Sequence, residues 1–387
     1  MIDIGNSALP RSQYLLDPRI TFLNHGAFGS CPRPVFEAYQ AWQLRIERQP
    51  EEYLWRNRDK YLDPVRQTLA DYFGTVPANL AFVPNATTGI NIVARSLKLQ
   101  PGDEVLASNH EYGAIDRTWR FIAAKTGAHY ITRELPLPLS THDDFVETFW
   151  GGVTDRTKVI CLSHITSPTA LIFPVAAICT RARAAGIVTV IDGAHVPGQL
   201  ALDLEAIGAD FYTGNGHKWL GTPRGAAFLH ARPEVQSQIE PLVVSWGYQS
   251  DHPSGSTFQD YLGWTGTRDL SAYLATAAAL EFIAENGWQQ VRGRCHRLAL
   301  KARERLQALI GEPPLCAQAE EWIAQMFAVQ LPARVDPERL EAELLTRYRI
   351  EVAVKRWQGL NLLRVSVAAY TTAEDLERLT EALRELL

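Results

Sequence analysis

The chain has 387 residues, of which 46% are hydrophobic and 21% are charged, and its formal net charge is -5 at pH 7. This length and apolar content can bury a large core and predict two or three domains. The small negative charge gives no general attraction to nucleic acid, and no apolar run reaches the roughly 18 residues of a membrane helix. The N-terminal stretch lacks the basic start and apolar run of a secretory signal. We therefore expect a cytoplasmic protein that binds neither nucleic acid nor membranes.

The cysteines and histidines form no pattern typical of a metal site or a disulfide framework. The five cysteines are Cys31, Cys161, Cys179, Cys295 and Cys316. Their number is odd and none of them forms a CxxC pair, which argues against both zinc binding and a disulfide-stabilised fold. The ten histidines are scattered and include no HExxH motif. We expect no bound metal.

Short β-rich runs alternate with helical patterns through the middle of the chain. The expected strands are Glu104–Ser108, Lys158–Ser163, Ile187–Ile191, Asp210–Thr213 and Gly225–Leu229. The expected helices between them include Gly89–Leu97, Val175–Ala185 and Leu204–Ile207. This alternation predicts an α/β domain with a mainly parallel sheet.

From about residue 270 the pattern changes to that of a smaller α+β domain. We expect one long helix over 271–287, a helix over Gln289–Ile310, a strand over Met326–Leu331, a helix after Pro337, a strand over Leu362–Ala368 and a final helix over Ala373–Leu387. The predicted organisation is therefore an N-terminal arm over 1–21 that packs on the small domain, a large domain over 22–270 and a small domain over 271–387.

An acid follows one of the expected strands, in the segment VIDGAH over 190–195. In an open α/β sheet, ligands bind beyond the carboxyl ends of the strands, so Asp192 lies where a ligand would bind. Taken alone, such a residue is equally well a helix cap or a loop carboxylate.

A lysine follows the next expected strand, in the segment NGHKW over 215–219. Lys218 there differs from a solvated surface lysine, because it follows a core strand among Asn, Gly and His. Burial and nearby cations lower the pKa of a lysine and make it a nucleophile. A lysine held as a Schiff base and an acid that protonates a pyridine nitrogen are the two groups that pyridoxal 5'-phosphate (PLP) needs, and Lys218 and Asp192 can supply both from neighbouring strands.

A third segment predicts a phosphate site. Residues 85–89, Asn-Ala-Thr-Thr-Gly, precede an apolar helical run. The hydroxyl and free N–H groups at a helix N-terminus bind anions, although an ordinary N-cap has the same sequence pattern. The three segments together, in this order, are more specific than any one of them.

These segments resemble the PLP-dependent aminotransferase class V family, which includes cysteine desulfurases, kynureninase-like enzymes and isopenicillin N epimerases. The chain is most similar to the isopenicillin N epimerase-like branch. The matching stretches are LNHGAFGSCP (23–32), NATTGIN (85–91), HEYGA (110–114), SHITSPTALIFP (163–174), DGAHVPGQ (192–199), ADFYTGNGHKWLGTPRGAAFL (209–229), SWGY (245–248) and WTGTRDLSAYLA (264–275). The resemblance implies the PLP-dependent transferase fold of type I, with a seven-stranded sheet in the large domain, and a homodimer.

The resemblance also implies roles around the cofactor ring. Lys218 would hold PLP as a Schiff base, Asp192 would pair with the pyridine nitrogen and His195 would lie near the phenolic oxygen. Tyr112 would stack on the ring. Ser167 stands where many relatives have an asparagine against the ring.

Further residues would bind the cofactor phosphate. Ala86 and Thr87 would hold it, with Asn215 and His217 assisting. Thr267 would reach the phosphate in the active site of the neighbouring subunit.

On the substrate side, Arg364 matches the arginine that binds a substrate carboxylate, for which a planar guanidinium is well suited. Asn24 and His25 lie in a Gly-rich loop that resembles the substrate side of the pocket, and a structural turn is the alternative interpretation. Trp246 and Tyr248 either line the pocket or belong to the core.

The shared machinery leaves the reaction open. Epimerisation of an amino acid or amino-acid derivative is the favoured hypothesis. A C–S lyase reaction by β-elimination, as in ergothioneine-type pathways, is the main alternative, followed by transamination. A PLP-fold protein that has lost catalysis is disfavoured because Lys218, Asp192 and Arg364 are all present. No GxGxxG follows an early strand, which argues against a nicotinamide dehydrogenase. The segment before Arg364 contains no cysteine, which argues against a desulfurase.

Overall fold

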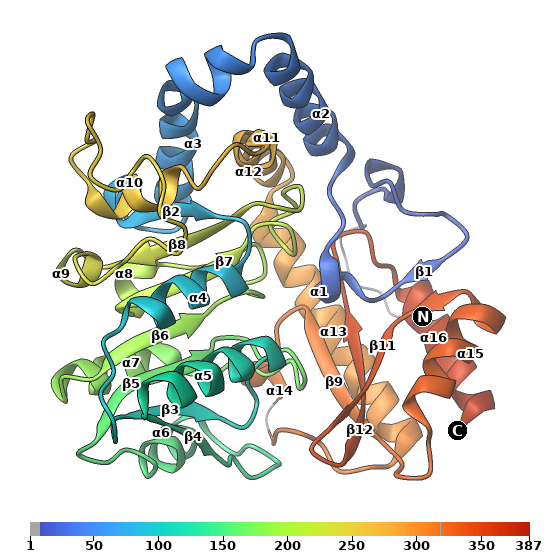
Figure 1. Cartoon of the computed structure of the whole chain (residues 1–387). Helices are drawn as coiled ribbons and strands as arrows, with labels where there is room; N and C mark the ends of the chain where they lie inside the picture. The colour runs from blue at the N-terminus through green and yellow to red at the C-terminus, as the bar shows by residue number, and fades with distance from the viewer. Residues whose placement is uncertain (1–7, 318) are drawn as a thin grey trace.

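The computed structural model of the chain describes residues 8–317 and 319–387. A large part, which carries a seven-stranded sheet, and a smaller part lie side by side (Figure 1). The strand order in the large sheet is β2-β8-β7-β6-β5-β3-β4. The strands are β2 (Leu80–Val83), β3 (Glu104–Ser108), β4 (His129–Arg133), β5 (Thr157–Ser163), β6 (Val188–Asp192), β7 (Phe211–Asn215) and β8 (Ala227–Ala231). Strand β8 is antiparallel to both of its neighbours and all other pairs are parallel, which confirms the predicted α/β fold with a mainly parallel sheet.

Both faces of this sheet are covered by helices. Alternate strand residues such as Val105 and Val190 pack with α4 (Ala86–Ser96) and α5 (Gly113–Thr126) in one apolar cluster. Their neighbours, such as Leu106 and Ile191, belong to the other cluster, which includes α7 (Val175–Ala184). Burial on both sides explains why these strands are nearly continuous apolar runs in the sequence. Other helices before residue 270 are α1 (His25–Phe28), α2 (Arg33–Arg48), α3 (Arg58–Tyr72), α6 (His142–Trp150), α8 (Leu204–Ile207), α9 (Pro233–Gln236) and α10 (Thr257–Gly263).

The smaller part is built on a three-stranded antiparallel sheet with the order β11-β12-β9. Its strands are β9 (Met326–Leu331), β11 (Ala353–Trp357) and β12 (Leu360–Ser366), and its helices are α13 (Trp288–Ile310), α14 (Ala319–Trp322), α15 (Pro337–Tyr348) and α16 (Ala373–Leu386). The N-terminal segment adds β1 (Thr21–Phe22), which pairs in parallel with β10 (Ile350–Glu351). Residues 1–7 of the predicted arm lie outside the described residues.

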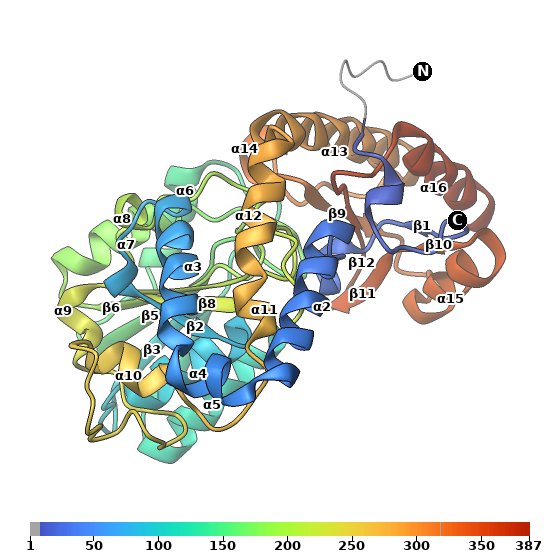
Figure 2. The ribbon, with the colours of Figure 1, turned by 90° about the horizontal axis from the view of Figure 1, so that it is seen from above.

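The predicted helix over 271–287 is wrong in one respect, because it is divided in two. Helix α11 (Ser271–Leu274) ends at Ala275, whose ψ of -5° is far from the helical value, and α12 (Thr276–Glu285) follows. No Gly or Pro stands at this division, since the glycine of the segment is Gly287, beyond the end of α12. Both pieces instead pack against α2 and α3, and α12 lies alongside these helices in Figure 2. Tertiary packing therefore decides the division.

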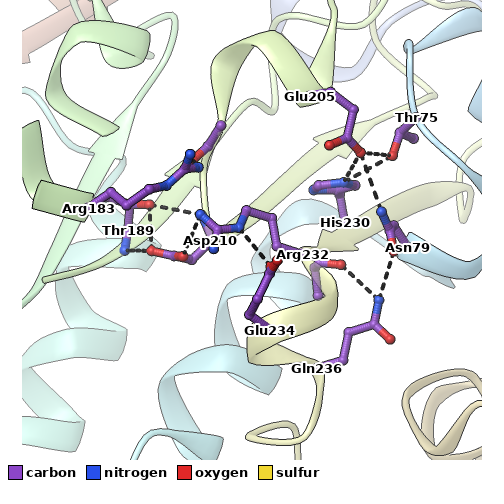
Figure 3. Close-up of polar contacts among 12 residues, drawn as sticks. Thr75, Asn79, Arg183, Thr189, Glu205, Asp210, His230, Arg232, Glu234 and Gln236 are labelled. Carbon is purple, nitrogen blue, oxygen red and sulfur yellow. Dashed lines mark hydrogen bonds and ion pairs between the residues drawn. The ribbon is translucent and has the colours of Figure 1, made fainter. Parts of the chain in front are cut away.

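Polar side chains form hydrogen bonds and ion pairs at the sheet edge where β6 and β7 begin (Figure 3). Asp210, just before β7, accepts hydrogen bonds from the N–H and hydroxyl of Thr189 at 2.8 and 3.0 Å and lies 3.5 Å from Arg232. The Glu205 carboxylate accepts a hydrogen bond from the Thr75 hydroxyl at 2.6 Å. These contacts hold the amino ends of the strands whose carboxyl ends form the candidate site at the opposite edge.

Within the described ranges, no helix combines the length and apolar character that a membrane crossing requires.

Candidate active site

Three polar side chains meet at the carboxyl edge of the sheet because the strands that carry them are in register. Ser163 pairs with Asp192 between β5 and β6, and Asp192 pairs with Thr213 between β6 and β7. All three are buried, and Asp192 accepts a hydrogen bond from the N–H of Ala194 at 2.9 Å. Burial raises the pKa of Asp192, while that hydrogen bond and the positive charge of Lys218 oppose the increase.

Lys218 lies three residues beyond β7, and its Nζ is 3.1 Å from Nε2 of His195. Burial, together with the positive charge of Arg364, lowers the pKa of Lys218 to about 7, and the charge of Asp192 partly opposes the decrease. A substantial fraction of neutral amine therefore exists near pH 7. This is the protonation state in which a lysine attacks a carbonyl carbon.

Trp219 sets the direction of the hydrogen bonds around His195. The indole N–H of Trp219 is 3.4 Å from Nδ1 of His195. An indole N–H can only donate, so Nδ1 must accept, and the ring proton of the neutral imidazole then lies on Nε2. Burial and the charge of Lys218 lower the pKa of His195 well below its usual value, so the ring is neutral. Nε2 consequently donates, and the amine of Lys218 can accept only when it is neutral.

Glu111 is a buried acid to which the sequence analysis assigned no role. It directly precedes Tyr112, and its two carboxylate oxygens accept hydrogen bonds from Ser108 at 2.6 Å and Ser163 at 2.7 Å. Burial raises its pKa to about 7, the two serines oppose the increase and the charge of Asp192 adds to it. The signal for this residue was its place in HEYGA, but only the contact with Ser163 brings it beside the Asp192 strand.

The N-terminus of α4 lies at the same edge of the sheet and offers an anion site. Asn85 is the N-cap, and its side chain accepts from the N–H of Thr88. The N–H of Ala86 donates to Asn215 Oδ1 at 2.8 Å. The prediction that Ala86 itself donates to a phosphate does not fit this arrangement, because that N–H is already used.

Within the described part of the chain, the N–H of Thr87 has no hydrogen-bond partner. Nδ1 of His217 is likewise buried without one. Gly89 brings this turn of α4 close to β7, since a Cβ there would lie 2.3 Å from the Thr213 hydroxyl oxygen. Free donors at a helix N-terminus are suited to a phosphate group.

Arg364 projects from β12 towards this edge and is 1% exposed. Its Nη1 donates to the backbone oxygen of Ser167 at 2.6 Å and lies 3.3 Å from the Ser167 hydroxyl. The Nε of Arg364 is buried without a partner. Among the described residues, the guanidinium of Arg364 forms no ion pair with an acid. Burial lowers the pKa of Arg364 to about 10. An arginine that is buried, charged and unpaired in this way is suited to an anionic ligand.

Ser167 belongs to a tight loop that supports Arg364. The loop is closed by hydrogen bonds between Thr166 and Leu171, and Thr169 holds Nδ1 of the buried His110 at 2.8 Å. Ala170 in this loop has a φ of 58°, a left-handed conformation that costs a residue with a Cβ about 1–2 kcal/mol. Strain of this kind persists where surrounding contacts demand one backbone path.

His25 is engaged in structural contacts. Its Nδ1 lies 3.0 Å from the hydroxyl of Tyr370 and its Nε2 lies 3.0 Å from the backbone oxygen of Lys218. Both ring nitrogens are used, so the prediction that His25 binds substrate does not fit this geometry. The neighbouring Asn24 differs, because its side-chain oxygen is buried without a partner.

Other predicted site residues lie at the surface. Tyr112, at the N-cap of α5, is 47% exposed, and Thr267 is also exposed. Trp246 is 68% exposed and packs edge-on against Trp55 at 5.9 Å, and Tyr248 is 45% exposed. Neither Trp246 nor Tyr248 belongs to the core of this chain.

Comparison with known proteins shows the family to which the chain is related. The model of the aminotransferase class-V family matches residues 31–379. The isopenicillin N epimerase of Amycolatopsis lactamdurans is 38% identical and the alignment covers 97% of each chain. The putative L-cysteine desulfhydrase 1 of Oryza sativa subsp. japonica is 29% identical, over 94% of this chain and 83% of that protein.

A solved structure supports the fold. A mutant of the protein C-DES, with glycine covalently linked to its PLP cofactor, superimposes with a TM-score of 0.84 at 22% identity, over 97% of this chain and 99% of that one. At this identity the likeness concerns the fold alone. The family model thus matches most of the chain, and a relative at 38% identity matches nearly its full length. The chain belongs to the aminotransferase class-V family of PLP-dependent enzymes.

Proposed function

We propose that this chain binds PLP through Lys218 and changes bonds at the α-carbon of an amino acid or amino-acid derivative, as an enzyme of the isopenicillin N epimerase type. The observation that carries the proposal is the buried amine of Lys218, with a lowered pKa, 3.1 Å from His195. The unpaired N–H of Thr87, the unpaired Nδ1 of His217, which can donate in the tautomer that carries its proton there, and the unpaired cation of Arg364 supply what a phosphate and a carboxylate need. The residues present therefore fit PLP and an amino acid.

Each residue would have a distinct task. When bound, PLP supplies an electron sink for a carbanion at the α-carbon. The Asp192 carboxylate would hold a proton on the pyridine nitrogen, and the N–H on His195 Nε2 would be offered to the phenolic oxygen. Thr87 and His217 would hold the phosphate, with Asn215 orienting the first turn of α4 through the N–H of Ala86.

Lys218 would also carry the α-proton. A general acid–base group works best when its pKa is near the working pH, and the pKa of this amine is lowered to about 7. Arg364 would hold the substrate carboxylate, with Ser167 fixing the guanidinium through its backbone oxygen. Positioning of this kind can lower a reaction barrier by several kcal/mol.

The second candidate function is C–S lysis by β-elimination. Epimerisation needs a second acid on the far face of the substrate, and His25 is engaged through both ring nitrogens. We propose Tyr112, at the N-cap of α5, for this role. β-Elimination needs only a leaving group at the β-carbon, and the similarity to an L-cysteine desulfhydrase favours it as the alternative.

Two observations weigh against a persulfide-forming desulfurase. The residues before Arg364 form a hairpin in which Gln358 and Gly359 alone connect β11 to β12, so no loop there can carry a cysteine into the site. Burial also raises the pKa of all five thiols, which are unpaired. Unpaired thiols fit the reducing cytoplasm, where we propose that the enzyme works.

The test is to reduce the PLP-loaded protein with borohydride and to map the label by peptide mass spectrometry. We expect the label on Lys218, because a substantial fraction of its buried amine is neutral near pH 7 while a normal lysine remains almost fully protonated. A label on any other lysine, or none after PLP is supplied, contradicts the proposal. Product analysis by NMR in deuterated water then separates inversion, which keeps the amino acid, from elimination, which releases a keto acid.

We propose further that the enzyme is a homodimer in which Thr267 contributes to the partner's active site. The proposal is supported by an aromatic cluster in which the exposed Trp55 and Trp246 and the partly buried Trp264 pack with ring centroids 5.9 and 5.7 Å apart. Thr267 follows this cluster in the chain. Exposed apolar patches of this kind are typical of interaction surfaces, and a two-fold interface would exchange the same residue in both directions.

Mixing two inactive variants tests this arrangement. Lys218→Ala removes the lysine and Thr267→Ala weakens the phosphate contact supplied to the partner. After subunit exchange at equal concentration, about a quarter of wild-type activity should return, because half of the dimers are hybrids and each has one complete site. Recovery that is absent after exchange, or a fully active monomer, contradicts the shared site.

A further inference from the structure

We propose that Lys355 and Arg364 form a paired cationic site for an amino-acid substrate that carries a second anionic group, a distal carboxylate, on its side chain. The inference rests on the proposed function, in which Arg364 holds the α-carboxylate. Lys355 would hold the distal one and would select for substrates of this class.

The register of the β11–β12 hairpin places the two cations on one face. Ala353 is opposite Arg364 and Lys355 is opposite Leu362. Residues at alternate positions of a strand share a face, so Lys355 and Arg364 are diagonal neighbours on the same side of the sheet. The Cβ atoms of such neighbours are about 7–8 Å apart or somewhat less. An amino acid with a side chain of several atoms spans that separation between its two carboxylates.

This face of the hairpin closes against the loops of the large part. At its inner end, Arg364 contacts Ser167. At its outer end, Trp357 packs 4.6 Å from the ring of His110, two residues before Tyr112. Trp357 is on the same face as Lys355, two positions along β11. Lys355 therefore lies between the inner and outer contacts, facing the loops that carry Tyr112 and Ser167.

The charges around Lys355 are not balanced by protein acids. Lys355 is partly buried, and among the ion pairs of the described residues it has no acidic partner within 4.0 Å. Burial and the charge of Arg364 lower its pKa to about 8, and Glu341 only partly opposes them. The Glu341 carboxylate accepts a hydrogen bond from the N–H of Val354, the neighbouring residue. Two cations placed together at partial burial favour an anion between or beside them.

The charge of Lys355 also reaches the catalytic group. It is one of the charges that lower the pKa of Lys218, after burial and Arg364. The same cation that would hold the distal carboxylate is thus close enough to the amine to affect its protonation. A surface lysine on the opposite face of the hairpin would not have this effect.

The test uses the PLP-loaded enzyme and two pairs of probes that differ by one carboxylate. Calorimetry compares binding of glutarate and butyrate, which lack the amine and cannot react. Deuterium exchange at the α-carbon compares L-2-aminoadipate with L-norleucine. Wild type should prefer the dicarboxylate in both pairs, and Lys355→Met should lower glutarate affinity and kcat/KM for aminoadipate by about 10- to 100-fold, the value of a charge-assisted hydrogen bond. Butyrate and norleucine should change by less than about twofold.

Arg356→Met is the matched control, since it removes the same charge from the exposed face of the same strand. It should leave all four probes unchanged. Equal losses for both members of a pair, equal effects of Arg356→Met, or no preference in wild type would overturn the inference. A fall in the thermal midpoint of Lys355→Met without ligand would also overturn it, because that result indicates a structural ion pair with Glu341. If glutarate binding depends on Lys355 but no probe exchanges its α-proton, the cationic site stands and the proposed reaction fails.

Discussion

Replacing Lys218 by methionine should lower the rate of α-deuterium exchange by at least about 10³-fold, because the variant loses both the cofactor-binding amine and the proton carrier. Methionine keeps a side chain of similar length, so the fold should be retained. Lys125→Met, an exposed lysine on α5, is the control and should keep full activity. Exchange in Lys218→Met within tenfold of wild type would contradict the assigned role.

Lys218→Met should also change how the stability of the apoprotein depends on pH. The pKa of Lys218 is lowered from 10.5 to about 7 in the folded protein without cofactor. Between these values the unfolded chain binds more protons than the folded one, so the stability of the wild-type apoprotein rises with pH through this window relative to Lys218→Met. The advantage of Lys218→Met in thermal midpoint should therefore be largest at pH 7 or below and should shrink towards pH 10.

Replacing Arg364 by methionine should lower kcat/KM for the substrate by about 10²- to 10³-fold, the range for removing one partner of a buried charge pair. Arg364→Lys should have an intermediate effect, since it keeps the charge and loses the planar fork. The loss should be seen in kcat/KM for the amino-acid substrate, whereas the affinity of the protein for PLP should change little.

Stability separates this role from a structural one. Arg364 is 1% exposed and its Nε has no partner, so in the absence of substrate it is a buried charge that costs free energy. The thermal midpoint of Arg364→Met without ligand should be unchanged or higher than that of wild type, measured by calorimetry. A clear fall would mean that its hydrogen bond to Ser167 is its main contribution.

Residue types and their order along the chain were sufficient to predict the centre of the site. Asp192 ends β6 and Lys218 follows the neighbouring β7, and the carboxyl ends of parallel strands lie at one edge of a sheet. The strands Glu104–Ser108 and Met326–Leu331 were predicted with their observed bounds, because buried strands carry a continuous apolar run between polar turns. The resemblance to aminotransferase class V then identified the cofactor.

What only the tertiary structure decided depends on contacts between distant segments. The N–H of Ala86 is used by Asn215, and His25 is used by Tyr370 and the Lys218 backbone, because loops far apart in sequence meet there. The helix over 271–287 is divided at Ala275 although no Gly or Pro lies near that position. Such outcomes follow from packing, which overrides local propensity.

The pairing of Lys355 with Arg364 is the clearest case. In the sequence they are nine positions apart in a basic segment, and nothing local distinguishes Lys355 from Arg356 beside it. The two-residue turn at Gln358 and Gly359 sets the hairpin register, and a register shifted by one residue would turn Arg356 instead of Lys355 to the face of Arg364. The sequence by itself thus determined the fold and placed Lys218 and Asp192 at one edge of the sheet, whereas the register of one hairpin decided which cation lies beside Arg364.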